Sequence, residues 1–345
     1  MENLKTFTET QIQELTAAGR YRTARAYQSA FNKLSTFLGR EADFGDICYD
    51  AMKGFELWMQ AGCLALNTTS FYVRNIRAIY NKGAKAGVFV ADSTVNPFSG
   101  VFTGVAKTAK RALEEVEIHK MVEAVGEELK DFKNGKVCKD CKDKKVVNDN
   151  RNCKDKKKSK TGFENREEKN ALLLFLFCFF AQGMPFADAV LLKKTAVVGD
   201  AALVYRRRKT GKEVIVFLTE PMRRIMDCFA AETHDSPYVF PFVKDVKDGR
   251  DEYRKYTVAL TNQNRRLKAV CRTAGLEKPV STHVARHSWA SAAYNNNIPV
   301  STISASLGHC SEKTTQIYLD MMNSGAVAQA NYAISNIFYN EKLKK

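Results

Sequence analysis

Long apolar runs are missing from this chain of 345 residues. The longest, residues 171–181, contains eleven residues, whereas crossing a hydrocarbon core takes about 20. We therefore expect a buried helix here and no membrane-spanning segment. The first residues also lack the charged-then-apolar order of an export signal, so we expect a cytoplasmic protein.

A disulfide framework and a metal centre are both hard to assemble from these residues. The nine cysteines are odd in number and scattered, which favours free thiols in a reducing compartment. Cys138 and Cys141 have the spacing of zinc ligands, with Cys153 nearby. A fourth ligand is missing, since His119 lies 19 residues before Cys138. We favour a solvated basic loop over zinc there, and we expect no metal and no cofactor.

Negative charge is also scarce. The chain has 54 Lys and Arg against 38 Asp and Glu, a net charge of +16, which favours nucleic acid or an anionic membrane surface as partner. Its length suggests two domains. We expect a helical domain at residues 1–105, a basic linker at 106–112 and a second domain at 113–345. A mobile basic insertion at about 133–165 interrupts the second domain, because residues 133–160 hold twelve Lys and Arg against four Asp.

The first domain is predicted to be a small helical bundle. Apolar residues recur at helical spacing within 27–38, 55–59 and 73–80, and Asp50 is expected to cap the second of these helices. A generic bundle with a solvated charged face remains an alternative. The interpretation we follow assigns DNA-phosphate contacts to basic residues of the bundle: Arg20, Arg22, Arg25, Arg74 and Arg77.

The second domain is predicted to be mainly α-helical with a small antiparallel β-sheet. Two β-rich runs, residues 201–205 and 214–218, flank a basic turn that contains Gly211 and indicate a β-hairpin. Beyond the buried helix, which is expected from about residue 167 to 180, further helices are expected at 220–231, 262–274, 283–295, 300–307 and 313 to about 321.

The residues that suggest chemistry lie near the end of the chain: His283, Arg286, His309 and Tyr318. On a helix, His283 and Arg286 share a face, and a hydroxyl residue at 281–282 is expected to cap that helix. A guanidinium with two imidazoles nearby suits one phosphate group. A tyrosine brought to the same phosphate could attack it.

A metal site is a weaker interpretation of the same segment. His283 and His287 are four residues apart, as zinc ligands on a helix can be, but Val284 stands where a zinc protease has Glu. Arg286 would also repel a cation. The remaining alternative is that these histidines are core or capping residues.

Three motifs resemble the second conserved box of the phage-integrase-type tyrosine recombinases: HxxR at residues 283–286, LGH at 307–309 and TxxY at 315–318. Their order and spacing match across about 36 residues. The basic turn at 206–211 resembles the hairpin of that family that carries the catalytic lysine, which is Lys209 here. The N-terminal bundle resembles the family's core-binding domain.

The resemblance implies a SAM-like core-binding domain joined to a mixed α+β catalytic domain. It implies a site-specific recombinase that integrates, excises or inverts a DNA segment. Tyr318 would attack the scissile phosphodiester and form a 3′-phosphotyrosyl link. Arg286 and His309 would bind the non-bridging oxygens, Lys209 would protonate the leaving 5′-oxygen, and His283 would assist proton transfer.

The resemblance also implies partners. Double-stranded DNA would be held partly by the hairpin arginines, and four protomers would act on two sites through a Holliday junction. The free chain would be a monomer, DNA-bending proteins could assist, and the protein would work at the nucleoid. We expect no additional arm-binding domain before the bundle. The tail at 325–338 would dock on a neighbouring protomer or on its own domain. The hairpin arginines are Arg206, Arg207 and Arg208.

One departure from the family pattern affects the expected activity. Gly183 and Asp188 fit the turn that usually carries the first catalytic arginine, but Pro185 occupies the arginine position and Gln182 precedes the glycine. Losing one such donor costs about 10²–10³ in rate. Either one of the hairpin arginines or Arg166 substitutes, or the enzyme is slow or inactive. The alternatives are a DNA-binding protein of this fold that has lost cleavage and a type IB-like topoisomerase.

Overall fold

The structure is a computed structural model that describes residues 3–91, 94–106, 112–124, 166–199, 201–312 and 315. It divides the chain into two compact units, residues 1–109 with 248–253 and residues 110–247 with 254–345. The expected basic insertion with its three cysteines, most of the expected helix from 313 to about 321 with Tyr318, and the tail at 325–338 lie outside the described residues. Within the described ranges, no helix is both long and apolar enough to cross a membrane.

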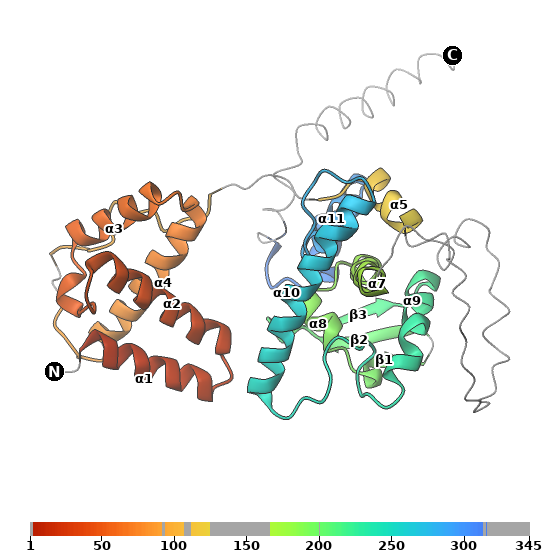
Figure 1. Ribbon diagram of the computed structural model, residues 1–345, viewed down its shortest axis with the longest axis horizontal. Helices are drawn as coiled ribbons and strands as arrows, with labels where there is room; N and C mark the ends of the chain where they lie inside the picture. Colours follow the sequence, from red (N-terminus) through yellow and green to blue (C-terminus); the bar gives the residue numbers. More distant parts are fainter. Residues whose placement is uncertain are drawn as a thin grey trace, which may run out of the picture. The chain divides into compact units, whose positions relative to one another are not determined.

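The first unit is a bundle built on four helices (Figure 1). The predicted helical spacing is confirmed, because Tyr27, Phe31 and Leu34 are all buried in its core. The predicted cap is wrong: the extended residue before the third helix is Cys48, and Asp50 lies inside the first turn. The helices are α1 (Leu4–Ala17), α2 (Tyr21–Leu38), α3 (Tyr49–Ala61) and α4 (Leu66–Lys85).

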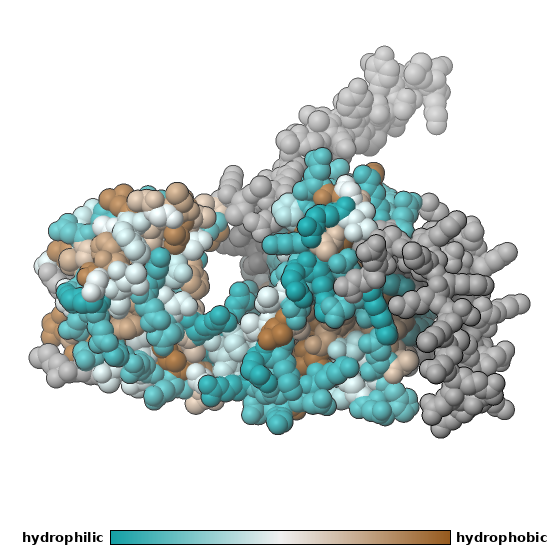
Figure 2. Space-filling model, in the orientation of Figure 1, coloured by the Kyte–Doolittle hydropathy of each residue, from teal (hydrophilic) through white to brown (hydrophobic). Residues whose placement is uncertain are grey.

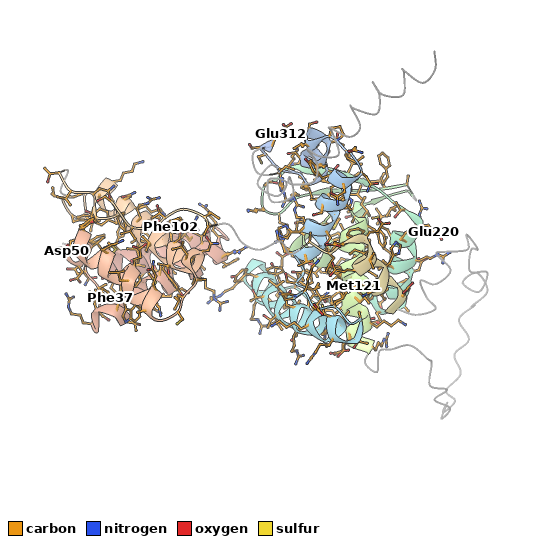
Figure 3. The ribbon with its side chains drawn as sticks, turned by 90° about the horizontal axis from the view of Figure 1, so that it is seen from above. Phe37, Asp50, Phe102, Met121, Glu220 and Glu312 are labelled. Atoms are coloured by element: carbon orange, nitrogen blue, oxygen red, sulfur yellow. The ribbon has the colours of Figure 1, made fainter. Side chains whose placement is uncertain are left out.

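The chain that follows α4 is fastened to the bundle by buried polar groups. Glu56 of α3 is 3 % exposed and accepts the backbone N–H of Phe102 at 2.8 Å. Asn67 bonds the backbone of Ala106 in both directions, at 2.7 and 3.0 Å. Figure 3 shows Phe102 and Phe37 among the side chains of this unit. The first unit therefore holds its backbone in place as far as residue 106.

The second unit is organised around α7 (Arg166–Phe180), which Figure 1 shows at its centre. The predicted buried helix is confirmed, since residues 171–178 are all buried. Phe177 packs edge-on against Phe240 with ring centroids 4.7 Å apart, and Met121 points into the same core (Figure 3). The other helices are α5 (Glu115–Ala124), α8 (Phe186–Val190), α9 (Glu220–Ala230), α10 (Gly249–Thr273), α11 (Val284–Asn295) and α12 (Val300–Ser306).

A three-stranded antiparallel sheet lies beside these helices, in the order β1 (Val197–Val198), β2 (Ala202–Arg206) and β3 (Glu213–Phe217). The predicted hairpin is confirmed by the register, which pairs Leu203 with Val216 and ends with Arg206 opposite Glu213. The short β1 was not predicted. The expected fold class, mainly α with a small antiparallel sheet, is confirmed.

Helix α10 is longer than predicted. It begins at Gly249 rather than at residue 262, and residues 248–253 group with the first unit. Charged and polar side chains fill its first half, and that composition resembles a loop in the sequence. On the face seen in Figure 2, hydrophilic side chains cover much of the second unit around α10 and α11.

Candidate active site

Arg286 lies at the centre of the site. It sits in the first turn of α11 and is only 2 % exposed. Its Nη1 donates to the carbonyl of Gly183 at 2.9 Å, and its Nη2 donates to the carbonyl of Leu307 at 2.5 Å. Nη2 also lies 2.9 Å from Nε2 of His309. Two segments far apart in the sequence, one around Gly183 and one at residues 307–309, therefore meet on one guanidinium.

Two glycines allow this close approach. Gly183 has φ +66°, and a Cβ there would lie 2.9 Å from the Cα of Arg286. Gly308 has φ +62°, and a Cβ there would lie 2.6 Å from Cδ of Arg207. Residues other than glycine rarely adopt a positive φ, and their Cβ atom would clash at both positions. The glycine of the LGH motif is thus explained by packing against an arginine.

His309 is buried and neutral. Because Arg286 can only donate, Nε2 of His309 must accept, so Nδ1 carries the proton and donates to Oγ1 of Thr315 at 2.8 Å. Burial, followed by the positive charges of Arg286 and Arg207, lowers the pKa of His309 to about 4. The ring is therefore uncharged at neutral pH.

His283 stands at the N-terminus of α11, next to His287, with the two ring centroids 4.8 Å apart. Loss of water around the ring, followed by the charges of His287 and Arg286, lowers the pKa of His283 to about 4. The expected hydroxyl cap at 281–282 is wrong, because α11 begins after His283 without a side-chain cap. The carbonyl of Ser281 accepts the N–H of Val284 instead, at 2.9 Å.

The three hairpin arginines differ in burial. Arg206 and Arg208 are exposed, whereas Arg207 is only 6 % exposed. Nη1 of Arg207 donates to the carbonyls of Leu307 and Gly308, at 3.0 and 2.9 Å. The carbonyl of Leu307 thus accepts from both Arg207 and Arg286, which brings the two guanidinium groups to the same site.

Asp188 joins the hairpin to the turn after α7. It is 6 % exposed, its Oδ1 accepts the backbone N–H of Arg208 at 3.0 Å, and its Oδ2 lies 3.8 Å from Nε of Arg207. Burial raises the pKa of Asp188, although the Arg208 N–H and the Arg207 charge oppose this shift. Pro185, which the resemblance places at the position of the first catalytic arginine, is the residue before α8.

Lys209 is exposed on the turn between β2 and β3. Its charge is among those that lower the pKa of both His283 and His309, which places it within electrostatic range of the site. Tyr318 lies outside the described residues; Thr315, three positions before it in the sequence, is fully buried beside His309. The structure therefore brings together His283, Arg286 and His309, with Lys209 nearby.

The arginines expected to contact DNA from the first unit lie on two helices. Arg20, Arg22 and Arg25 are exposed where α2 begins. On α4, Arg74 is exposed, and Arg77 is half-buried and bonds Oγ1 of Thr103 at 3.4 Å. None of the five forms an ion pair with another described residue.

Among the described residues, no three His, Cys, Asp or Glu side chains lie close enough together to hold a metal ion. The three cysteines of the expected basic insertion lie outside those residues. The side chains that face one another around Arg286 are a second guanidinium and neutral imidazoles, with Asp188 behind Arg207, and such a combination suits an anion.

Comparison with known families agrees with both units. Residues 161–324 match the phage integrase family, and residues 3–96 match the phage integrase SAM-like domain. A helical SAM-like bundle followed by a mainly α domain with a small sheet is the architecture of this class. The chain belongs to the phage integrase family.

Individual curated relatives match this chain over less than half of its length. The tyrosine recombinase XerD of Bradyrhizobium diazoefficiens is 30 % identical over 168 residues, 44 % of this chain and 49 % of the relative. The tyrosine recombinase XerA of Pyrococcus furiosus is 33 % identical over 117 residues, 34 % of this chain and 38 % of the relative. The chain thus spans about half the length of the curated relatives it matches, or less.

Solved structures share the fold at low sequence identity. A lambda integrase (75–356) dimer bound to a COC′ core site matches with TM-score 0.58 and 14 % identity, over 94 % of this chain and 97 % of that one. The Tn1549 transposon integrase in complex with transposon right end DNA matches with TM-score 0.57 and 12 % identity, over 97 % and 99 %.

Proposed function

We propose that this protein is a site-specific tyrosine recombinase that cleaves and rejoins DNA to integrate, excise or invert a segment. The observation that carries the proposal is the buried guanidinium of Arg286, held by two backbone carbonyls and paired with a neutral His309. A guanidinium fixed in this way is preorganised for phosphate. Membership of the phage integrase family supports the same activity.

The proposed reaction is a phosphoryl transfer without metal or ATP. The hydroxyl of Tyr318 attacks the phosphorus, a bond from the tyrosyl oxygen to phosphorus forms, and the bond to the 5′-oxygen breaks. Lys209 gives a proton to the leaving 5′-oxygen, and His283 receives the tyrosyl proton. The free energy of the phosphodiester is kept in the 3′-phosphotyrosyl link, and the reverse attack by a 5′-hydroxyl rejoins the strand.

The lowered pKa values keep both histidines neutral at pH 7. His283 thus has an unprotonated ring nitrogen, and the negative charge of a bound phosphate would raise its pKa toward the value that a general base needs. His309 currently accepts from Arg286 through Nε2, so donating from that nitrogen to a non-bridging oxygen requires its other tautomer. We propose that His309 adopts this tautomer when DNA binds, so that the contact between the two side chains opens toward the phosphate while the two carbonyls keep the guanidinium in place.

Double-stranded DNA is the proposed partner. Exposed arginines on α2 and α4, together with the hairpin, would contact phosphates. Lambda integrase, which shares the fold, has been crystallised as a tetramer bound to a Holliday junction, with TM-score 0.58 and 14 % identity. We propose the same assembly here: monomers in solution, four protomers on two sites and, where needed, DNA-bending accessory proteins. Such a protein would work at the nucleoid, in the cytoplasm.

The proposal assigns a role to each domain of the chain. Residues 1–105 form the core-binding domain, 106–112 the linker and 113–345 the catalytic domain with its insertion at about 133–165. The match of the SAM-like family model to residues 3–96 supports the first assignment.

A second candidate is a DNA-binding protein of the same fold that no longer cleaves. Pro185 favours it, because this residue offers no cation where the family has its first catalytic arginine. The two candidates differ in one property, covalent attachment to DNA.

Covalent trapping tests the proposal. The protein is incubated with the DNA that flanks its own coding sequence, carrying a nick beside the scissile site so that the cleaved end is lost. We expect a protein–DNA adduct on a denaturing gel, which disappears in the Tyr318→Phe variant. Salt-sensitive binding without an adduct would contradict the recombinase and favour the second candidate.

A further inference from the structure

A developing phosphorane carries negative charge on two non-bridging oxygens, and the turn before α8 supplies no cation to stabilise it. Pro185 fills that place, with φ −62° and ψ 143°. The sequence alone could not decide which other cation replaces the missing arginine. The structure separates the candidates by their burial and contacts.

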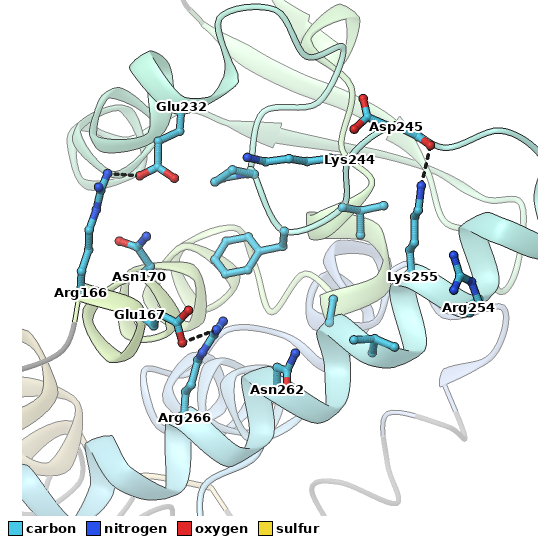
Figure 4. Close-up of a pocket in the computed structure, with 15 residues that line it drawn as sticks. Arg166, Glu167, Asn170, Glu232, Lys244, Asp245, Arg254, Lys255, Asn262 and Arg266 are labelled. Atoms are coloured by element: carbon cyan, nitrogen blue, oxygen red, sulfur yellow. Dashed lines mark hydrogen bonds and ion pairs between the residues drawn. The ribbon is translucent and has the colours of Figure 1, made fainter.

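Arg166 is the least suitable candidate. Its side chain is 75 % exposed and pairs with Glu232 at the edge of a groove of about 710 Å³ (Figure 4). The neighbouring Arg266 of α10 reaches Glu167 in the same groove. Neither Arg166 nor Glu232 is among the groups that shift the pKa of His283 or His309.

Arg207 differs from Arg166 in its burial, its contacts and its effect on the site histidines. It is buried, its charge lowers the pKa of both His283 and His309, and it shares the carbonyl of Leu307 with Arg286. Arg207 comes directly after β2, and its backbone N–H still bonds the carbonyl of Lys212 at 2.8 Å. Continued alternation past the end of the strand places it on the same face as Leu203 and Tyr205, which packs against the core.

The contacts of Arg207 leave one donor without an acceptor. Nη1 bonds two carbonyls, but Nε is buried and has no hydrogen-bond partner among the described residues. The nearest carboxylate oxygen, Oδ2 of Asp188, lies 3.8 Å away, too far for a hydrogen bond. A buried N–H of a charged group without an acceptor is costly, and it indicates that an anion completes the site.

We propose that Arg207 replaces the missing arginine as the second guanidinium of the phosphate site. It comes from the residue that follows β2 rather than from the turn before α8, and Asp188 positions it. Arg207 and Arg286 then hold the two non-bridging oxygens between them. This inference rests on the proposed recombinase function.

The test uses a substrate in which a methyl group replaces one non-bridging oxygen of the scissile phosphate. This methylphosphonate lacks the charge that a second guanidinium would stabilise. The Arg207→Ala variant should form the covalent adduct about 10²–10³-fold more slowly than wild type on normal DNA. On the methylphosphonate, the deficit should shrink by at least about tenfold, because the missing cation is no longer needed.

Two further variants make the result decisive. Arg207→Met keeps most of the side-chain volume without the charge, so it serves if Arg207→Ala does not fold, as judged by thermal unfolding. Arg166→Ala removes the rival cation and should cleave both substrates like wild type.

Each outcome separates the inference from the proposed function. Wild-type cleavage with no deficit in the Arg207 variants, or an equal deficit on both substrates, would overturn the role of Arg207 and leave the recombinase standing. A deficit in Arg166→Ala that the methylphosphonate relieves would assign the role to Arg166. No adduct from wild-type protein on either substrate would overturn both proposals.

Discussion

Arg286 is oriented by hydrogen bonds to groups that carry no charge. They are the carbonyls of Gly183 and Leu307 and the neutral ring of His309. These three contacts fix the guanidinium without neutralising it. The acid in electrostatic range is Asp188, whose pKa is raised by burial, and the charge of Arg286 is among those that oppose this shift.

The two site histidines predict how stability depends on pH. An unfolded histidine titrates near pH 6.5, whereas His283 and His309 titrate near 4 in the folded protein. Between these values the unfolded chain binds more protons, so the free energy of unfolding falls as the pH is lowered through this window. Urea denaturation at several pH values should show this fall, and it should be shallower in His309→Gln. Parallel curves for the two proteins would contradict the lowered pKa of His309.

Single residues of the site were only partly predictable. The pairing of Arg286 with a histidine follows from motif spacing, because both stand in segments that the family pattern brings together. The distinct position of Arg207 was missed, since three consecutive arginines were interpreted as one basic turn. The signal was present in the strand period, which places Arg207 on the same face as Leu203 and Tyr205. The hydrogen bonds of Arg207 to the carbonyls of Leu307 and Gly308 depend on tertiary packing, and no local sequence pattern indicates them.

Among the elements, the turn between α7 and α8 does most to position the site. It places the carbonyl of Gly183 under Arg286 and then begins the short helix that carries Asp188. The β2–β3 hairpin meets it from the other side through Asp188 and the Arg208 N–H. The guanidinium groups therefore depend on two elements that are themselves joined.

This arrangement predicts a large effect of Gly183→Ala. The new Cβ would lie 2.9 Å from the Cα of Arg286 on a backbone with φ +66°. The strain amounts to about 1–3 kcal/mol, and the clash adds to it. Gly199→Ala is the matched control, because Gly199 has φ +53° with nothing within 4 Å of the new Cβ. We expect both variants to lose stability in urea denaturation and Gly183→Ala to lose more. Equal losses would contradict the close approach to Arg286.

The elements with strong local patterns were predicted, and those without were not. Helix α2 shows a clear apolar period, and the hairpin has two β-rich runs around a glycine. The first half of α10 is too polar to show an apolar face, and β1 has only two residues. The start of α11 was predicted one residue early with a side-chain cap. A backbone turn from Ser281 to Val284 takes the place of that cap.

At the scale of the whole molecule, the excess of positive charge determines how the protein meets its partner. The net charge is +16, and the first unit carries exposed arginines on α2 without ion pairs among the described residues. Such a surface favours a polyanion at long range, and its effect weakens with salt. The sequence predicted this property directly, because it depends on composition more than on packing.

DNA binding should therefore fall steeply with salt. Six to ten phosphate contacts lose about 10³–10⁵ in affinity between 50 and 200 mM salt. Replacing Arg20, Arg22 and Arg25 with Gln should weaken binding and reduce the slope of log K against log salt by about three. Arg40→Gln is the control. It removes one positive charge that is already paired with Asp46, through hydrogen bonds of 2.5 and 2.8 Å, so the slope should stay close to that of wild type. Equal slopes for the triple variant and wild type, measured by fluorescence anisotropy, would contradict a role of α2 in phosphate contacts.

Strand exchange tests the central claim most directly. Two duplexes that carry the flanking sites of the gene are incubated with the protein, and the products are sequenced across the junctions. We predict recombinant junctions at a single position, absent with Tyr318→Phe. Relaxation of supercoiled DNA without exchange would indicate a topoisomerase, and binding without either reaction would indicate a protein that has lost cleavage. Either result would contradict a site-specific recombinase.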